Sequence, residues 1–207
     1  MTLVFALDLA AVFVFALTGA LAASRAQLDP IGFIFLAALT AVGGGTVRDL
    51  LLDRNPVFWL DQPIFILVAA IAAVIVFFTA HLLESRLKTL TWLDALALGV
   101  AVSAGVAVAL SLGQDWPVVL IMGVVTGTLG GLMRDVVCNE VPLILAHGEL
   151  YVSSAFAGAA FAVIAQGLGI GETVAILGCG LVTVALRAGS LAFGWRLPTY
   201  KSRPPKR

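Results

Sequence analysis

The sequence predicts an all-α integral membrane protein with seven transmembrane helices, built as an inverted repeat of two three-helix units followed by a seventh helix. Hydrophobic residues make up 61% of the chain and charged residues 12%, whereas soluble domains usually carry about 25% charged residues. A membrane-spanning helix needs about 20 apolar residues, so 207 residues leave room for roughly seven spans. A glycine-rich segment that ends in Arg-Asp also occurs twice, once in each half.

Apolar runs separated by polar or proline-containing breaks predict where each span lies. The first run looks like a secretory signal, but no positive residue precedes it and Asp8 lies within it, so we interpret it as the first helix. We expect one transmembrane domain over residues 1–195 and a basic cytoplasmic tail over residues 196–207. The predicted spans are about 3–24, 30–52, 62–83, 90–112, 116–138, 149–170 and 173–195.

A shift of the sequence by 86 residues places polar residues and glycines of the first half on identical residues of the second, without a gap. The coincident pairs are Asp8 with Asp94, Gly19 with Gly105, Asp29 with Asp115, Thr40 with Thr126, Gly44 and Gly45 with Gly130 and Gly131, Arg48 and Asp49 with Arg134 and Asp135, and Pro56 with Pro142. Repeat one therefore covers about 3–83 and repeat two about 90–170. Because each unit has three spans, the second unit begins on the opposite face of the membrane, which makes the repeat inverted.

Positive residues in the loops predict the orientation in the membrane. One side carries eight Lys and Arg residues, whereas the other side carries Arg54 alone. The positive-inside rule therefore places the C-terminus in the cytoplasm and the N-terminus outside. The eight positive residues are Arg25, Arg86, Lys88, Arg196, Lys201, Arg203, Lys206 and Arg207.

Charged side chains inside the predicted spans fall at two levels, and an uncompensated charge is costly there. The outer level holds Asp8, Arg48 and Asp49, and the cytoplasmic level holds Asp94, Arg134, Asp135 and Arg187. We predict that Asp8 pairs with Arg48 and that Asp94 pairs with Arg134. Since successive side chains on a helix diverge by about 100°, Asp49 and Asp135 are expected to face a water-filled path. Alternatively, the ion pairs only hold the helices together.

Glycines precede both Arg-Asp pairs and are expected to break the helices there: Gly43, Gly44, Gly45, Gly130 and Gly131. A helical glycine costs roughly 1 kcal/mol relative to alanine, and an unwound turn is tolerated in a membrane only beside protein or water. Carbonyl oxygens exposed by such a turn can replace the hydration shell of a cation. Thr40 and Thr126 lie one to two turns earlier and are candidates to line the same path. The alternatives are close helix packing by the glycines and threonine hydroxyls that bond their own backbone.

The two glycine motifs, followed in the second half by Asn-Glu-Val-Pro from residue 139, resemble the bacterial branch of the trimeric intracellular cation channel family. Members are also catalogued as an uncharacterised membrane family and as glycine transporters. The resemblance covers roughly residues 5–195. It implies a homotrimer in the bacterial plasma membrane. Each subunit would have a pore lined by glycine-kinked second and fifth helices, with potassium as the chief permeant ion.

We predict a passive, potassium-permeable channel that needs no cofactor and is surrounded by membrane lipids. Inverted repeats with broken helices are also typical of secondary transporters. A carrier of a small zwitterion such as glycine is therefore the alternative, and a membrane scaffold is a third. Nothing in the sequence predicts an enzyme or a metal site, since no nucleophile with a base, metal cluster or phosphate loop is recognisable. The net charge of +0 gives no support to nucleic-acid binding.

Overall fold

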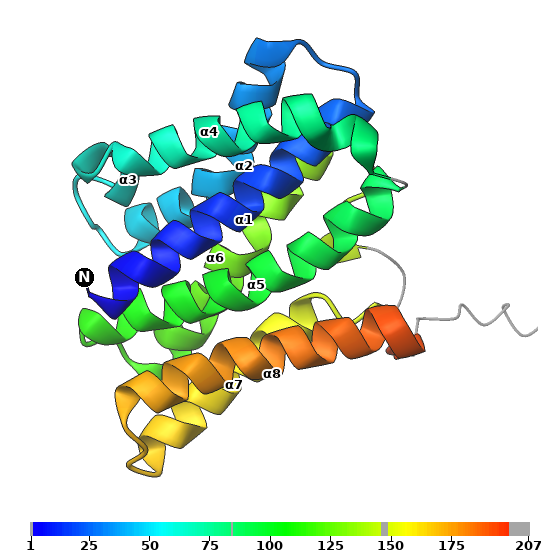
Figure 1. Ribbon diagram of the computed structural model, residues 1–207. Coiled ribbons are helices and arrows are strands. Elements are labelled where there is room, and N and C mark those ends of the chain that lie inside the picture. The colour runs from blue at the N-terminus through cyan, green and yellow to red at the C-terminus, as the bar shows by residue number, and fades with distance from the viewer. Residues whose placement is uncertain (1, 84, 146–148, 199–207) are drawn as a thin grey trace, which may run out of the picture.

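The chain folds into a bundle of helices, shown in Figure 1 as a computed structural model that describes residues 2–83, 85–145 and 149–198. Six of the helices are long and apolar enough to cross a membrane by length and composition, and a seventh, α7, is shorter. The main helices are α1 (Leu3–Arg25), α2 (Pro30–Leu51), α4 (Ile64–Thr79), α5 (Arg86–Ser111), α6 (Trp116–Val137), α7 (Val152–Gly167) and α8 (Glu172–Phe193). Three short helical segments join them: α3 (Phe58–Asp61), η1 (Ala80–Leu82) and η2 (Leu143–Leu145).

The observed helices follow the seven predicted spans closely. The span predicted over 62–83 is formed by α4 and η1, and the span predicted over 149–170 is reduced to the 16 residues of α7. The short helix α3 was not foreseen, because it has no room for a periodic apolar pattern. Most of the predicted basic tail, residues 199–207, lies outside the residues that the structure describes.

Local capping explains where several helices begin. Asp29 caps α2 by accepting a hydrogen bond from the Gly32 amide at 2.7 Å, and Pro30 occupies the first helical position. Ser85 caps α5 in the same way with the Lys88 amide at 3.3 Å. As a result, α5 begins four residues before the span predicted over 90–112. At the other end of the chain, Gly194 terminates α8 in the left-handed conformation that glycine favours (φ 69°).

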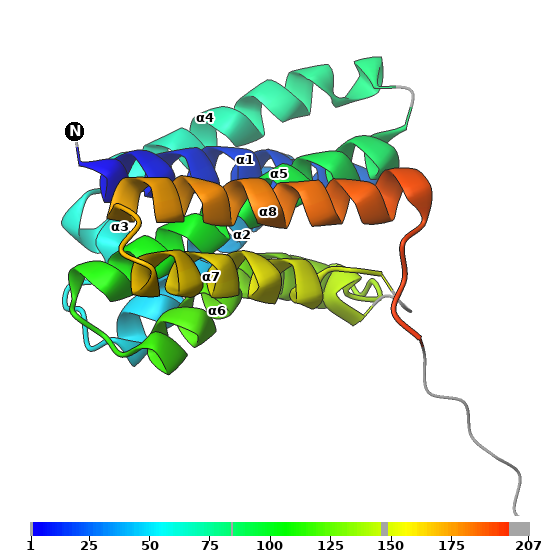
Figure 2. The same cartoon turned by 90° about the horizontal axis from the view of Figure 1, so that it is seen from below.

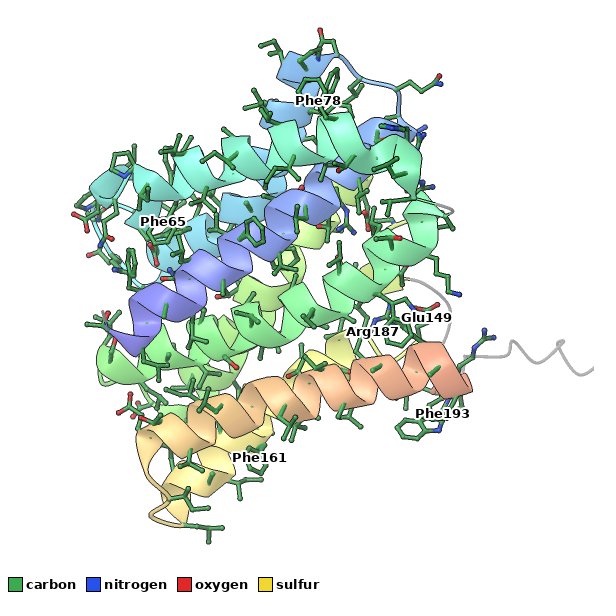
Figure 3. The ribbon with its side chains drawn as sticks, in the orientation of Figure 1. Phe65, Phe78, Glu149, Phe161, Arg187 and Phe193 are labelled. Atoms are coloured by element: carbon green, nitrogen blue, oxygen red, sulfur yellow. The ribbon has the colours of Figure 1, made fainter. Side chains whose placement is uncertain are left out.

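Four helices, α1, α2, α5 and α6, form the centre of the bundle. Helix α4 packs against α1 and α2, whereas α7 and α8 pack against α5 and each other. Figure 2 shows α1, α5 and α8 side by side in one layer and α6 and α7 in another, with α4 on the far side of the first layer. Figure 3 shows that Phe78 and Phe193 lie on the outside, where they are 67% and 75% exposed. Apolar outer faces of this kind suit contact with lipid.

The glycine motifs form the contact between α2 and α6. A Cβ atom on Gly44 would collide with the backbone carbonyl oxygen of Thr126, and one on Gly130 would collide with that of Thr40. The two contacts are equivalent under the shift of 86 residues. The absence of side chains therefore lets the backbones of α2 and α6 touch at two matched points.

The expected break in these helices is not observed. Helix α2 continues through Gly43, Gly44 and Gly45, and α6 continues through Gly130 and Gly131. The physical reason is that the close backbone approach offsets the low helix propensity of glycine. The prediction of an unwound turn was therefore wrong, and the alternative of close helix packing describes these glycines.

The paired contacts predict an effect on stability. Gly44→Ala and Gly130→Ala should each lower the free energy of unfolding by about 3 kcal/mol, the upper end for overpacking, because the opposing atom is a backbone oxygen that cannot rotate away. Gly167→Ala is the matched control, since a Cβ atom there would meet nothing within 4 Å. Chemical unfolding in detergent measures the difference, and equal effects of Gly44→Ala and Gly167→Ala would contradict the packing role.

Candidate functional site

The first half of the chain holds a buried charge cluster that we name the first triad: Asp8 on α1 with Arg48 and Asp49 on α2. Arg48 Nη1 donates to Asp8 Oδ1 at 2.8 Å, and Arg48 Nε donates to Asp49 Oδ1 at 2.8 Å. The second oxygen of Asp49 accepts a hydrogen bond from the backbone amide of Phe58 at 2.8 Å. Arg48 and Asp49 are fully buried and Asp8 is 6% exposed. The predicted pairing of Asp8 with Arg48 is confirmed.

The second half holds the equivalent second triad: Asp94 on α5 with Arg134 and Asp135 on α6. Arg134 donates to Asp94 Oδ1 at 2.8 Å and to Asp135 Oδ1 at 2.7 Å, which confirms the pairing of Asp94 with Arg134. Asp135 Oδ2 accepts from the amide of Leu143 at 2.9 Å. One contact has no equivalent: Arg134 Nη1 also lies 3.0 Å from Thr18 Oγ1 on α1. The residue equivalent to Thr18 is Ala104, which has no hydroxyl.

Asp49 and Asp135 do not face a water-filled path, so this expectation was wrong. Both carboxylates are hydrogen-bonded inside the protein. One oxygen of each accepts from the neighbouring arginine, and the other accepts from a backbone amide eight or nine residues later. The divergence of neighbouring side chains did not prevent contact, because the arginine side chain is long enough to bring Nε to the adjacent carboxylate. Asp49 and Asp135 thus fix the chain that follows α2 and α6.

Each triad carries two carboxylates and one guanidinium, a formal charge of −1. A further arginine lies near each one. Arg54 Nη1 lies 3.6 Å from Asp49 Oδ1 at the first triad, and its side chain is 33% exposed. Arg187 lies near the second triad and is fully buried.

Arg187 sits between a carboxylate and an aromatic ring. Its Nη1 donates to Glu149 Oε2 at 2.7 Å, and its guanidinium carbon lies 5.0 Å from the centre of the Tyr151 ring. Glu149 and Arg187 lie together between α5 and α8 in Figure 3. Arg187 was predicted at the level of the second triad, whereas Glu149 and Tyr151 were not predicted as its neighbours. Glu149 stands at the edge of a predicted span, where charged residues are common and give no signal.

The two triads lie apart along α1. The second triad contacts α1 at Thr18, ten residues after Asp8. At 1.5 Å per residue this separation is about 15 Å along the helix axis. A narrow cavity lies between these levels and is lined in part by Asp8, Gly44 and the two equivalent residues Thr40 and Thr126. With a volume of about 10 Å³ it has room for about one water molecule.

Thr40 and Thr126 also bond their own helices. The Thr40 hydroxyl donates to the carbonyl of Leu36 and the Thr126 hydroxyl to that of Met122, each at 2.6 Å. The Nη2 atoms of Arg48 and Arg134 are buried and have no hydrogen-bond partner among the residues that the structure describes. In the same part of the chain, no three His, Cys, Asp or Glu side chains are grouped so that they could hold a metal ion.

Comparisons with known proteins agree with this arrangement. A family model described as "Glycine transporter" matches residues 5–81 and again residues 91–167. A crystal structure of the TRIC trimeric intracellular cation channel orthologue from Rhodobacter sphaeroides is 40% identical, with a TM-score of 0.90, and the match covers 94% of this chain and 100% of that chain. The protein belongs to the TRIC family. The resemblance inferred from the glycine motifs is thereby confirmed.

Other relatives of this TRIC family member are known from sequence or structure. The UPF0126 membrane protein of Vibrio cholerae is 35% identical over 204 residues, covering 96% of this chain and 83% of the relative. The UPF0126 inner membrane protein YadS of Escherichia coli is 35% identical over 207 residues, covering 96% of each. A second TRIC channel structure, which concerns the basis of conductance, has a TM-score of 0.86 at 32% identity and covers 98% of this chain and all of that chain.

The triads of this TRIC protein predict a stability effect. Asp94→Asn removes one of the two carboxylates that pair with the fully buried Arg134 and should lower the free energy of unfolding by about 1.5–3 kcal/mol, the range for a hydrogen bond to a charged group. Asp115→Asn is the control, because Asp115 is exposed and makes no side-chain cap bond, so a change within about 0.5 kcal/mol is expected. The measurement is unfolding in detergent. A loss at Asp94 no larger than at Asp115 would show that the buried pair is not needed for stability.

Proposed function

We propose that the protein is a passive channel for monovalent cations, chiefly potassium, with a path through each subunit between α1, α2, α5 and α6. The observation that carries the proposal is the pair of triads, each with two carboxylates to one buried guanidinium. Similarity to TRIC cation channel structures at 40% and 32% identity supports it.

The surplus negative charge explains why cations would be preferred. A charge in a region of low dielectric acts strongly on an ion nearby, since solvent screens it little. Two such centres about 15 Å apart along α1 would attract cations and repel anions at both levels of the path. The arginines strengthen this arrangement, because they hold the paired carboxylates in place without cancelling the charge.

The path itself is proposed to follow the matched surfaces of α2 and α6. The cavity beside Asp8, with Thr40, Thr126 and Gly44 in its walls, supports this location. We assign Gly43, Gly45, Gly130 and Gly131 to the same lining, where they keep bulky side chains out. In this role the glycines act by being small, not by breaking the helix.

The two halves are proposed to form an inverted repeat. The family model matches the chain twice, once in each half, and the triads and glycine contacts recur at equivalent positions. Figure 1 shows the equivalent helices α1 and α5 running in opposite directions beside each other. Opposite directions are what an inverted repeat requires.

We propose a homotrimer in the bacterial inner membrane, surrounded by lipid, with the N-terminus outside and the C-terminus in the cytoplasm. The Escherichia coli relative is described as an inner membrane protein and the Rhodobacter sphaeroides structure as trimeric. The apolar outer surface and the asymmetry of Lys and Arg in the loops support the membrane and the orientation.

A carrier for a small zwitterion such as glycine is the rival function. The description of the family model favours it. The continuous helices α2 and α6 favour a channel instead, because carriers of this build present the ends of broken helices to the substrate. The proposed channel performs no enzymatic step.

Recording in planar bilayers tests the proposal. The purified protein should give discrete unitary potassium currents, and a KCl gradient should move the reversal potential toward that of potassium, because both triads repel chloride. Asp135→Asn should reduce this preference, whereas Asp115→Asn, at an exposed helix start, should leave it unchanged. Saturable glycine uptake into vesicles without unitary currents would overturn the channel and favour the carrier.

A further inference from the structure

The helix outside the repeat brings a third buried arginine to one triad only. Arg187 on α8 is fully buried, and its Nε and Nη2 atoms have no partner among the described residues. Its one ion-pair partner in the described structure is Glu149, at 2.7 Å. Because α8 lies outside the repeat, Arg187 has no equivalent in the first half of the chain.

Tyr151 connects Arg187 to the second triad. A Cβ atom on Gly131 would lie 3.1 Å from the Tyr151 hydroxyl and 3.4 Å from Asp94 Oδ1, so the hydroxyl and the carboxylate meet over this glycine. The guanidinium of Arg187 lies over the ring of Tyr151, with its carbon 5.0 Å from the ring centre. The positive charge of Arg187 is therefore only one ring away from the triad.

The formal charges at this end depend on Glu149. The second triad alone carries −1, and Arg187 would reduce the sum to zero. Glu149 restores −1 by pairing with Arg187. At the first triad Arg54 has the same sign, but its side chain is 33% exposed, so solvent as well as Asp49 compensates its charge. Arg187 is completely buried, so only a protein charge can compensate it.

We propose that Glu149 determines charge selectivity at the second-triad end of the path: by neutralising Arg187, it keeps this end attractive to cations. The inference rests on the proposed channel function. Tyr151 is the positioning residue that holds Arg187 beside the triad. Glu149 is also the one member of this cluster with substantial contact with solvent, since its side chain is 31% exposed.

Reversal potentials in a KCl gradient test this assignment with three variants. Glu149→Gln should lower the potassium-to-chloride permeability ratio by at least roughly tenfold, because one unit charge about 10 Å away at an effective dielectric of about 20 changes the energy of each ion by about that factor, in opposite directions for potassium and chloride. Arg187→Gln should raise the ratio, because Glu149 then adds to the triad. The double variant with both changes should return it to the wild-type value.

A selectivity role predicts that the two single variants change the permeability ratio in opposite directions, whereas a structural role does not. If Glu149→Gln does not fold, the rise expected for Arg187→Gln still tests the assignment. Glu172→Gln is the control, since this exposed carboxylate lies at the other end of α8 and should leave the ratio unchanged. Three unchanged ratios, or three that fall alike, overturn the role of Glu149 and leave the channel standing. A wild-type protein without current overturns the channel and this inference together.

Discussion

The cost of burying a guanidinium governs this structure. Arg48 and Arg134 are completely buried in an apolar helix bundle, where an uncompensated charge is not tolerated. Each arginine pairs with one carboxylate from another helix and with a second from the next residue in the chain. This requirement fixes the axial register of α2 against α1 and of α6 against α5. The second oxygen of Asp49 or Asp135 then holds the chain that leaves each helix. One electrostatic requirement thus sets helix register and loop path in both halves.

The contact between the halves depends on a different interaction. Helices α2 and α6 meet at Gly44 and Gly130, where each glycine faces a threonine carbonyl of the other helix. The triads align helices within a half, and the glycines let the halves come together. The residues proposed to line the path therefore also stabilise the fold, so that a substitution among them alters the packing as well.

Most of the fold could be predicted because hydropathy and repetition are strong signals in this chain. The seven spans and the pairing of Arg48 with Asp8 and of Arg134 with Asp94 followed from apolar runs and from coincident charges 86 residues apart. The state of the glycines could not be predicted, because low helix propensity and close packing give the same sequence pattern. The amide partners of Asp49 and Asp135 could not be predicted either, because every residue type except proline has a backbone amide and the sequence does not distinguish one from another. Glu149 and Tyr151 were missed because their roles depend on a loop that only the tertiary fold brings to Arg187.

The extra hydroxyl at Arg134 shows how far the duplicated halves have diverged. Thr18 contacts the guanidinium of Arg134, whereas the equivalent residue in the second repeat, Ala104, has no hydroxyl to offer Arg48. In the proposed channel, ions arriving from the two faces of the membrane would therefore meet unlike energy profiles. Such a channel would rectify, that is, pass more current in one direction than in the other.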